Sequence, residues 1–352
     1  MGRPMWLSGL TRQISGAGGP IKSYGSDMPA EPSGTTMPPR PKIGLALGAG
    51  VARGWSHIGV IQVLEEAGFA PDVVAGTSIG ALVGGCYAAR KLPELEEFAR
   101  GLTRGRVFRL LDLAWSRSGM LSGDKLRELL DQALGETRIE HLEKPFICIG
   151  TELLTGHEIW LRSGRLSKAI RASYALPGVF TPVFFKQFWL IDGAVVNPIP
   201  VSACRALGAR LVVAVNLNND VFGGTVIQAP EIEQINGTGS NNFASSDPSQ
   251  PQQKSFLRQM FAGSEADTPG FTTVLMAAFN ISQDRMARSR LAGDPPDISV
   301  NPLAHDIGLF DFDKAAEAIE AGRDAARKAL PEIERLITVL NTASHMQIGN
   351  DR

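Results

Sequence analysis

The chain has 352 residues, enough for one large domain or two of average size. Its 35 Lys and Arg residues nearly balance 36 Asp and Glu residues, and the formal net charge of −1 argues against an extended basic surface for DNA or RNA, so we expect no nucleic-acid partner. The 38 Gly and 22 Pro residues make up about 17% of the chain, against roughly 12% on average, which indicates many turns or disordered segments.

Three stretches of biased composition border or interrupt the rest of the chain. Residues 1–41 are rich in Gly, Pro and Ser and lack periodicity, so we expect a disordered leader. Residues 222–270, rich in Asn, Ser, Gln and Pro, predict a mobile surface insertion. Residues 341–352 form a polar tail. One domain, residues 42–340 with this insertion, accounts for the remainder.

Within residues 42–340, short apolar strands alternate with helices. The expected strands are 43–47, 73–75, 146–150, 157–161, 188–191 and 211–217. The expected helices are 57–67, 81–90, 124–134, 202–207, 271–291 and 313–330, the last continued or kinked at Pro331. This alternation predicts an α/β fold with a mostly parallel sheet that helices cover on both faces.

A G-x-S-x-G motif from Gly76 to Gly80 lies directly between an expected strand and an expected helix. In this context the central serine sits on a strained turn, and the two glycines let the strand and the helix approach each other. Ser78 is therefore a candidate nucleophile. The alternative is that Ser78 only caps the following helix, although a cap requires neither glycine.

A second glycine-rich loop, Gly48–Gly54, follows the first expected strand. A dinucleotide motif would need glycine or alanine at position 53, which is Arg, and no Gly-Lys-Ser/Thr follows as in a P-loop. The remaining interpretation is an oxyanion hole, in which backbone N–H groups at a helix start stabilise developing negative charge. Its candidate residues are Gly48, Ala49, Gly50, Val51 and Arg53. For Arg53, a positive charge beside the loop and a surface salt bridge remain equal alternatives.

A third candidate is Asp192, which ends an apolar strand and precedes Gly193 and Ala194. Active-site groups gather where the strands of an α/β sheet reach its carboxyl edge, so this carboxylate would meet Ser78 there. An Asx-turn after the strand is the alternative, and only pairing with Ser78 favours the functional interpretation.

Together the three motifs resemble those of the patatin-like phospholipase family, specifically the small bacterial branch similar to the catalytic domain of neuropathy target esterase. The resemblance runs from about Lys42 to about Leu217 and resumes near Ser289 and over residues 306–312. It implies that residues 42–340 are a catalytic domain with a three-layer α/β/α sandwich. By motif match, it also implies a Ser78 nucleophile and an Asp192 base, with motif support from Gly54, Gly76, Gly80 and Gly193.

The sequence departs from this family at two loop positions. Family members usually have glycines where this chain has Ala49 and Val51, and a positive φ at position 51 would strain a β-branched Val. Gly50 is therefore the foremost expected donor. No cofactor is implied, and no metal either, because the sequence has no HxxEH, HExxH or Cys/His cluster.

Three histidines bear on the choice of base. His305 follows Asp192, as a conventional Ser-Asp-His triad requires, and remains an alternative base. His57 opens a helix and indicates a structural or capping residue, while His345 lies in the polar tail. A direct dyad requires instead a desolvated Asp192 whose pKa is raised toward neutrality.

A basic segment with aromatic residues suggests contact with a membrane. Its arginines are Arg100, Arg104, Arg106, Arg109 and Arg117. Such a segment fits an anionic bilayer, although an ordinary helix with solvated arginines is the commoner alternative. Three widely spaced cysteines and the lack of a secretory signal pattern favour a cytoplasmic protein, with peripheral contact at the inner face of the membrane as the further hypothesis.

The sequence thus predicts a serine acyl hydrolase that releases fatty acid from a phospholipid or lysophospholipid through an acyl-enzyme on Ser78. One alternative is a thioesterase or general carboxylesterase that uses the same dyad. Another is a catalytically weak regulatory protein on the same fold, which the departure at Val51 supports. A dinucleotide-binding enzyme would leave Ser78 and Asp192 unexplained.

Overall fold

The computed structural model describes four stretches of the chain: residues 40–110, 123–218, 271–304 and 306–350. The expected leader lies outside them except for its last two residues, and the expected insertion at 222–270 lies outside them entirely. Arg117 and His305 are also outside the described residues. Within the four stretches, no helix is both long enough and apolar enough to cross a bilayer.

Eight strands of the described residues form a single sheet. They are β1 (Ile43–Leu47), β2 (Val73–Thr77), β3 (Phe146–Glu152), β4 (Glu158–Leu161), β5 (Val183–Phe185), β6 (Phe188–Asp192), β7 (Leu211–Val215) and β8 (Ile298–Val300). Their order is β5-β6-β3-β2-β1-β7-β8, and β4 pairs with β3 off this path. The pairs from β3 across to β8 are parallel, whereas β4 and β6 run antiparallel to β3 and β5 runs antiparallel to β6. The sheet is mostly parallel, as expected.

The helices surround this sheet. They are α1 (Ser56–Glu66), α2 (Ile79–Ala88), α3 (Leu92–Arg100), α4 (Arg104–Leu110), α5 (Asp124–Leu134), α6 (Leu166–Ser173), α7 (Val201–Ala206), α9 (Phe271–Gly293) and α10 (Ala315–Asn350). Short 3-10 helices are η1 (Val51–Trp55), η2 (Ile139–His141), η3 (Gly193–Val195) and η4 (Phe312–Lys314). α10 continues through Pro331, so the segment expected as a polar tail is helical up to Asn350.

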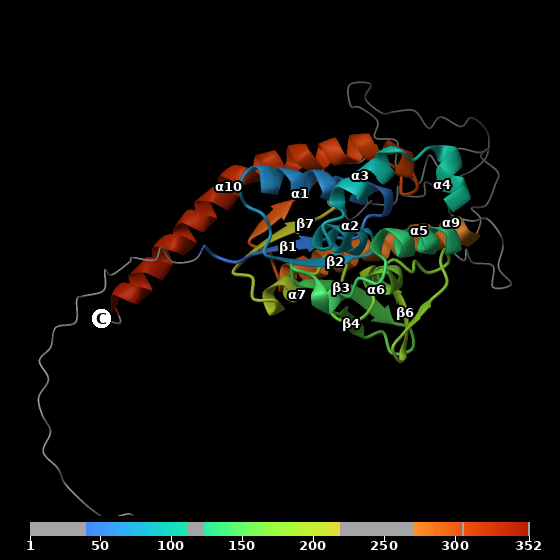
Figure 1. Ribbon diagram of the computed structural model, residues 1–352, viewed down its shortest axis with the longest axis horizontal. Helices are drawn as coiled ribbons and strands as arrows, with labels where there is room; N and C mark the ends of the chain where they lie inside the picture. The colour runs from blue at the N-terminus through green and yellow to red at the C-terminus, as the bar shows by residue number, and fades with distance from the viewer. Residues whose placement is uncertain (1–39, 111–122, 219–270, 305, 351–352) are drawn as a thin grey trace, which may run out of the picture. The chain divides into compact units, whose positions relative to one another are not determined.

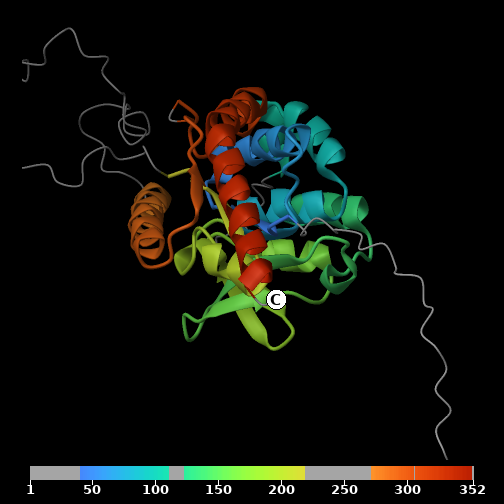
Figure 2. The ribbon, with the colours of Figure 1, turned by 90° about the vertical axis from the view of Figure 1, so that its left-hand side faces the viewer.

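Helices cover both faces of the sheet, which carry two separate cores. Successive side chains of a strand point to opposite faces, so one strand contributes to both cores. Leu45 and Leu47 of β1 belong to a large core that includes side chains of α1, α2 and α10. Ala46 belongs to a second core, which includes side chains of α7 and α9. Helix α10 lies beside α1 (Figure 1), and α9 lies on the opposite side of the sheet from α1 (Figure 2). The three layers confirm the expected α/β/α sandwich.

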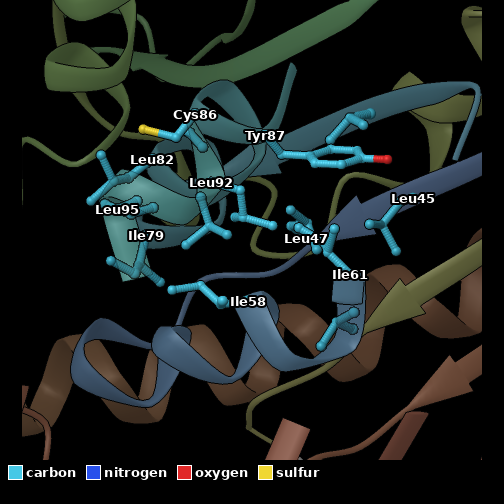
Figure 3. Close-up of a cluster of buried hydrophobic side chains, with 14 of the residues drawn as sticks. Leu45, Leu47, Ile58, Ile61, Ile79, Leu82, Cys86, Tyr87, Leu92 and Leu95 are labelled. Atoms are coloured by element: carbon cyan, nitrogen blue, oxygen red, sulfur yellow. The ribbon is translucent and has the colours of Figure 1, made fainter. Parts of the chain in front are cut away.

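Helix α2 lies deep in the larger core. All ten of its residues are buried, which is typical of a helix with apolar residues all round. Figure 3 shows Ile79 and Leu82 of α2 in the same cluster as Ile58 of α1 and Leu47 of β1. This packing fixes the start of α2, and with it the residue that precedes the helix, Ser78.

Candidate active site

Ser78 occupies a strained turn between β2 and α2. Its φ of 57° and ψ of −122° lie in a region that residues other than glycine rarely adopt. A side chain at Gly76 would place its Cβ 2.3 Å from the carbonyl oxygen of Gly80, and one at Gly80 would lie 2.2 Å from that of Leu47. The backbones therefore approach too closely for a side chain at either position. This close approach is what the G-x-S-x-G motif predicts for a turn between a strand and a helix.

The hydroxyl of Ser78 donates a hydrogen bond to Oδ2 of Asp192 over 2.7 Å. The other carboxylate oxygen, Oδ1, accepts the N–H of Ala194 at 2.8 Å. Asp192 is fully buried. This burial raises the pKa of the carboxyl from 3.8 to about 7, although the hydrogen bonds from Ser78 and Ala194 act in the opposite direction. Such a carboxylate is matched to proton transfer near neutral pH.

The sheet register brings this pair together across β3. Thr77, just before the serine, pairs with Ile149, and Asp192 pairs with Gly150, the next residue of β3. The sequence led us to expect Asp192 at the carboxyl edge as the end of a parallel strand, whereas β6 runs antiparallel to β3. Asp192 therefore lies opposite Ser78 because of its register on β3, not because of the direction of its strand.

Gly193 lets the chain leave β6 close to β3. A Cβ at this position would lie 2.3 Å from the carbonyl oxygen of Ile149. No side chain fits there without moving one backbone away from the other. The glycine after Asp192 thus holds the carboxylate in its place beside Ser78.

The glycine-rich loop uses several of its N–H groups to hold itself in the fold. The N–H of Gly48 donates to the carbonyl of Val215 (3.1 Å), and that of Ala49 donates to the carbonyl of Pro198 (2.9 Å). The expected donors Gly48 and Ala49 are therefore already engaged with backbone acceptors. This finding corrects the five-residue donor set inferred from the sequence.

Among the described residues, no backbone carbonyl accepts the N–H groups of Gly50 and Val51 at the start of η1. Gly50 precedes this helix and Val51 begins it, and the first N–H groups of a helix have no acceptor inside it. The next one, that of Ala52, donates to the carbonyl of Leu309 at 3.1 Å. Val51 has a φ of 51°, so the β-branched residue does occupy a strained position where glycine would be relaxed.

Arg53 points away from solvent and is only 4% exposed. Its Nη1 donates to the carbonyl oxygen of Leu217 at 3.3 Å, and burial lowers the pKa of the guanidinium to about 10. A surface salt bridge, one of the two interpretations from sequence, is therefore wrong. Among the described residues that line the cavity beside Ser78, Arg53 is absent.

His57 is fully buried, and its Nε2 donates to the carbonyl oxygen of Gly48 over 2.8 Å. Burial lowers the pKa of the imidazole to about 4, so the ring is neutral at pH 7. His57 holds the glycine-rich loop, which confirms the structural role expected for it. His305, the alternative base, falls outside the described residues.

One residue of the site has no counterpart in the sequence-based set. The hydroxyl oxygen of Ser173, in the last turn of α6, accepts the backbone N–H of Ser78 at 2.9 Å. Ser173 is fully buried. It lies 95 residues from Ser78 in the chain and in no motif, so no local signal indicated it.

A cavity of about 110 Å³ opens at the Ser78–Asp192 pair. Within the described residues, the rest of its lining is apolar or aromatic, including Val51, Leu82, Phe98, Val107, Leu126 and Phe180. A second cavity of about 440 Å³ lies between α2, α3 and α5, and Leu82, Phe98 and Leu126 line both. Such walls fit a hydrocarbon chain. The described residues contain no group of three or more His, Cys, Asp or Glu side chains that could hold a metal ion.

Comparison with known proteins assigns the chain to a family. Residues 45–205 match the family described as Patatin-like phospholipase. An uncharacterized NTE family protein of Mycobacterium tuberculosis is 33% identical, over 84% of this chain and 92% of that protein. The chain belongs to the patatin-like phospholipase family. This confirms the resemblance that the three motifs indicated.

Two further proteins are similar to this chain, one over a small part of its own length and the other with low sequence identity. The lysophospholipase NTE1 of Mycosarcoma maydis is 38% identical, over 50% of this chain but only 10% of that protein. The crystal structure of VipD from Legionella pneumophila is similar with a TM-score of 0.42 and 15% identity, over 84% of this chain and 67% of that chain.

Proposed function

We propose that the protein is a serine acyl hydrolase that releases fatty acid from a phospholipid or lysophospholipid. The observation that carries this proposal is the 2.7 Å hydrogen bond from the hydroxyl of Ser78 to the buried carboxylate of Asp192. A serine on a strained turn, paired with a base whose pKa is about 7, has the arrangement of an activated nucleophile.

In the proposed first half-reaction, the carboxylate of Asp192 takes the hydroxyl proton while Ser78 Oγ attacks the ester carbonyl carbon. The carbonyl oxygen becomes negatively charged in the tetrahedral intermediate, and the N–H groups of Gly50 and Val51 are the donors left in the loop to stabilise it. The C–O bond to the leaving alcohol then breaks, and Asp192 gives its proton to that alcohol. An acyl ester on Ser78 remains.

In the second half-reaction, Asp192 takes a proton from water, whose oxygen attacks the acyl carbon. A second tetrahedral intermediate uses the same two N–H groups, and its collapse breaks the bond to Ser78 Oγ, which regains the proton from Asp192. Fatty acid leaves and the site returns to its initial state. The base acts in both halves, so its loss should slow both.

The apolar cavity supports a long acyl chain as the recognised part of the substrate. Asp192 is the only charged side chain among the described residues that line it, so nothing in this lining selects a head group. The same observation favours a second candidate, a thioesterase or general carboxylesterase that uses the same Ser78 and Asp192. Family membership and the relative named as a lysophospholipase support the lipid ester.

The test combines active-site labelling with substrate comparison. A fluorophosphonate probe should label the wild-type protein and fail to label Ser78→Ala. Release of fatty acid from lysophospholipid, phospholipid and an acyl thioester of the same chain length then separates the two candidate activities. Absence of labelling in folded wild-type protein would instead support a regulatory protein that has kept the fold.

A second comparison tests the dyad itself. Asp192→Asn should lose most of the activity, whereas His305→Asn should retain it. If His305→Asn abolishes turnover in folded protein while Asp192→Asn keeps most of it, the proposed base is wrong.

A further inference from the structure

Several large apolar side chains are exposed close together near one edge of the sheet. Nine such side chains of the described residues are exposed, and four of them gather around the end of β3 and the β5–β6 hairpin. We call these four the apolar edge: Leu153, Leu154, Phe184 and Trp189, with exposed fractions from 45% to 83%. Exposed apolar groups that cluster in this way mark interaction sites.

Strand register shows that the apolar edge is continuous. The last residue of β3, Glu152, pairs with Leu190 of β6, so the hairpin extends past the end of β3. The N–H of Leu153 donates to the carbonyl of Trp189 at 2.8 Å. Phe184 pairs with Trp189 across the hairpin, and their ring centroids are 5.1 Å apart. Leu153, Trp189 and Phe184 therefore lie in one row across neighbouring strands, and Leu154 follows Leu153 in the chain.

This surface lies at the same edge of the sheet as the candidate active site. β2 and β3 are parallel, so Ser78, which follows β2, and Leu153, which follows β3, come at the same edge. Asp192 is the third residue after Trp189, a separation of about 10 Å along a strand. The strand that supplies the carboxylate at one end thus presents an exposed tryptophan near the other.

Exposed basic side chains lie on α4, a helix that also contributes to the cavity beside Ser78. Arg104, Arg106 and Arg109 are exposed on α4, while Val107 of this helix is buried and lines the cavity with Ser78. Arg104 also contacts Asp313 at 3.3 Å. Lys186, also exposed, lies in the turn of the β5–β6 hairpin. Exposed aromatic groups and basic side chains together are the combination that binds the interfacial region of an anionic bilayer.

We propose that the apolar edge and the arginines of α4 dock the protein on the surface of an anionic lipid bilayer. The inference rests on the proposed lipid substrate, because docking by this edge would bring the catalytic cavity to the membrane surface. Trp189 and Phe184 insert among the head groups, and Arg106 and Arg109 meet the negative lipid charge. No bilayer-spanning helix is required for such binding.

Vesicle flotation with the full chain tests the apolar part. Wild-type protein should float with vesicles of phosphatidylcholine and phosphatidylglycerol, and binding should weaken as salt rises. The double variant Phe184→Ala/Trp189→Ala should bind at least about tenfold more weakly. Val339→Ala is the matched control, because Val339 is 51% exposed on α10, away from the edge, and should bind like wild type.

The arginines are tested in the same assay. Arg106→Gln/Arg109→Gln should lose most of the preference for anionic vesicles over pure phosphatidylcholine, whereas Arg335→Gln on α10 should keep it. Equal binding of wild type and Phe184→Ala/Trp189→Ala overturns the proposal, as does failure of the wild type to bind either vesicle. Self-association of the wild type that these substitutions abolish would assign the edge to a second copy of the chain instead.

Hydrolysis of a soluble short-chain ester separates this inference from the proposed function. The docking variants should cleave that ester as fast as wild type, because none of the changed residues lines the cavity beside Ser78. If wild type floats through the apolar edge but cleaves no ester, the proposed function fails while membrane docking stands. Cleavage of the ester without flotation overturns membrane docking and leaves the proposed function standing.

Discussion

Replacing Asp192 with Asn should reduce hydrolysis and should also change how the free energy of unfolding depends on pH. Burial raises the pKa of Asp192 to about 7, whereas in the unfolded chain it keeps an ordinary value near 3.9. Between these pH values the folded protein binds more protons than the unfolded chain, so its free energy of unfolding falls as pH rises. At 1.36 kcal/mol per pKa unit, the loss approaches about 4 kcal/mol once the pH exceeds 7.

Asn at position 192 does not ionise, so the variant avoids this loss. Its stability relative to wild type should therefore rise by up to about 4 kcal/mol between pH 4 and pH 8, whatever constant cost the substitution carries. His57 acts in the opposite sense, because burial lowers its pKa to about 4, but its contribution is common to both proteins and cancels in the difference. Hydrolysis should fall by about 10²–10⁴ with the loss of the base.

Urea unfolding of both proteins at several pH values between 4 and 8 measures the effect. Ser78→Ala is the control, because it is equally inactive but keeps the carboxylate, and its stability should fall with pH as that of wild type does. The wild-type kcat/KM should rise with pH around a midpoint near 7 as Asp192 ionises. A stability difference between wild type and Asp192→Asn that is the same at pH 5 and pH 8 would refute the raised pKa.

Three further substitutions probe the site. Ser173→Ala leaves the buried N–H of Ser78 without its 2.9 Å acceptor and should lower the free energy of unfolding by about 1–3 kcal/mol, with reduced kcat, in urea unfolding and steady-state assays. Gly193→Ala places a Cβ 2.3 Å from the carbonyl of Ile149 and should reduce fluorophosphonate labelling, whereas unchanged labelling would contradict the close approach. Phe98→Ala removes part of the wall that two cavities share. It should raise kcat/KM for long-chain relative to short-chain esters several-fold. An unaltered ratio would show that this wall does not limit the length of the acyl chain.

Local sequence was sufficient to predict the turn that carries Ser78, the proposed nucleophile. The segment from β2 through Ser78 to α2 is contiguous, and the demand for glycine at positions 76 and 80 arises from backbones within a few residues or in the adjacent strand. The short strand Ile43–Leu47 and helix Asp124–Leu134 have the bounds that periodicity predicted. In these elements the local pattern predicts the structure, although the close approach at Gly80 also involves Leu47 of the adjacent strand β1.

Asp192 was identified from sequence for a reason that holds only in part. Its position at the end of an apolar strand made Asp192 a candidate, but the sequence pattern does not predict the direction of β6 in the sheet. Antiparallel pairing with β3 and the register Gly150–Asp192 place the carboxylate next to Ser78. A strand's direction depends on which neighbour it pairs with, and that choice is made by the whole sheet.

The sequence by itself determined the family, the α/β class and the two residues proposed to act on the substrate. Only the tertiary structure narrowed the proposed oxyanion donors to Gly50 and Val51, because the N–H groups of Gly48 and Ala49 donate to the carbonyls of Val215 and Pro198. It alone placed Ser173 in contact with Ser78 and brought the residues of the apolar edge together from separate segments. Motifs encode contacts between neighbours in the chain, whereas these contacts join residues brought together by packing of the complete sheet and its helices.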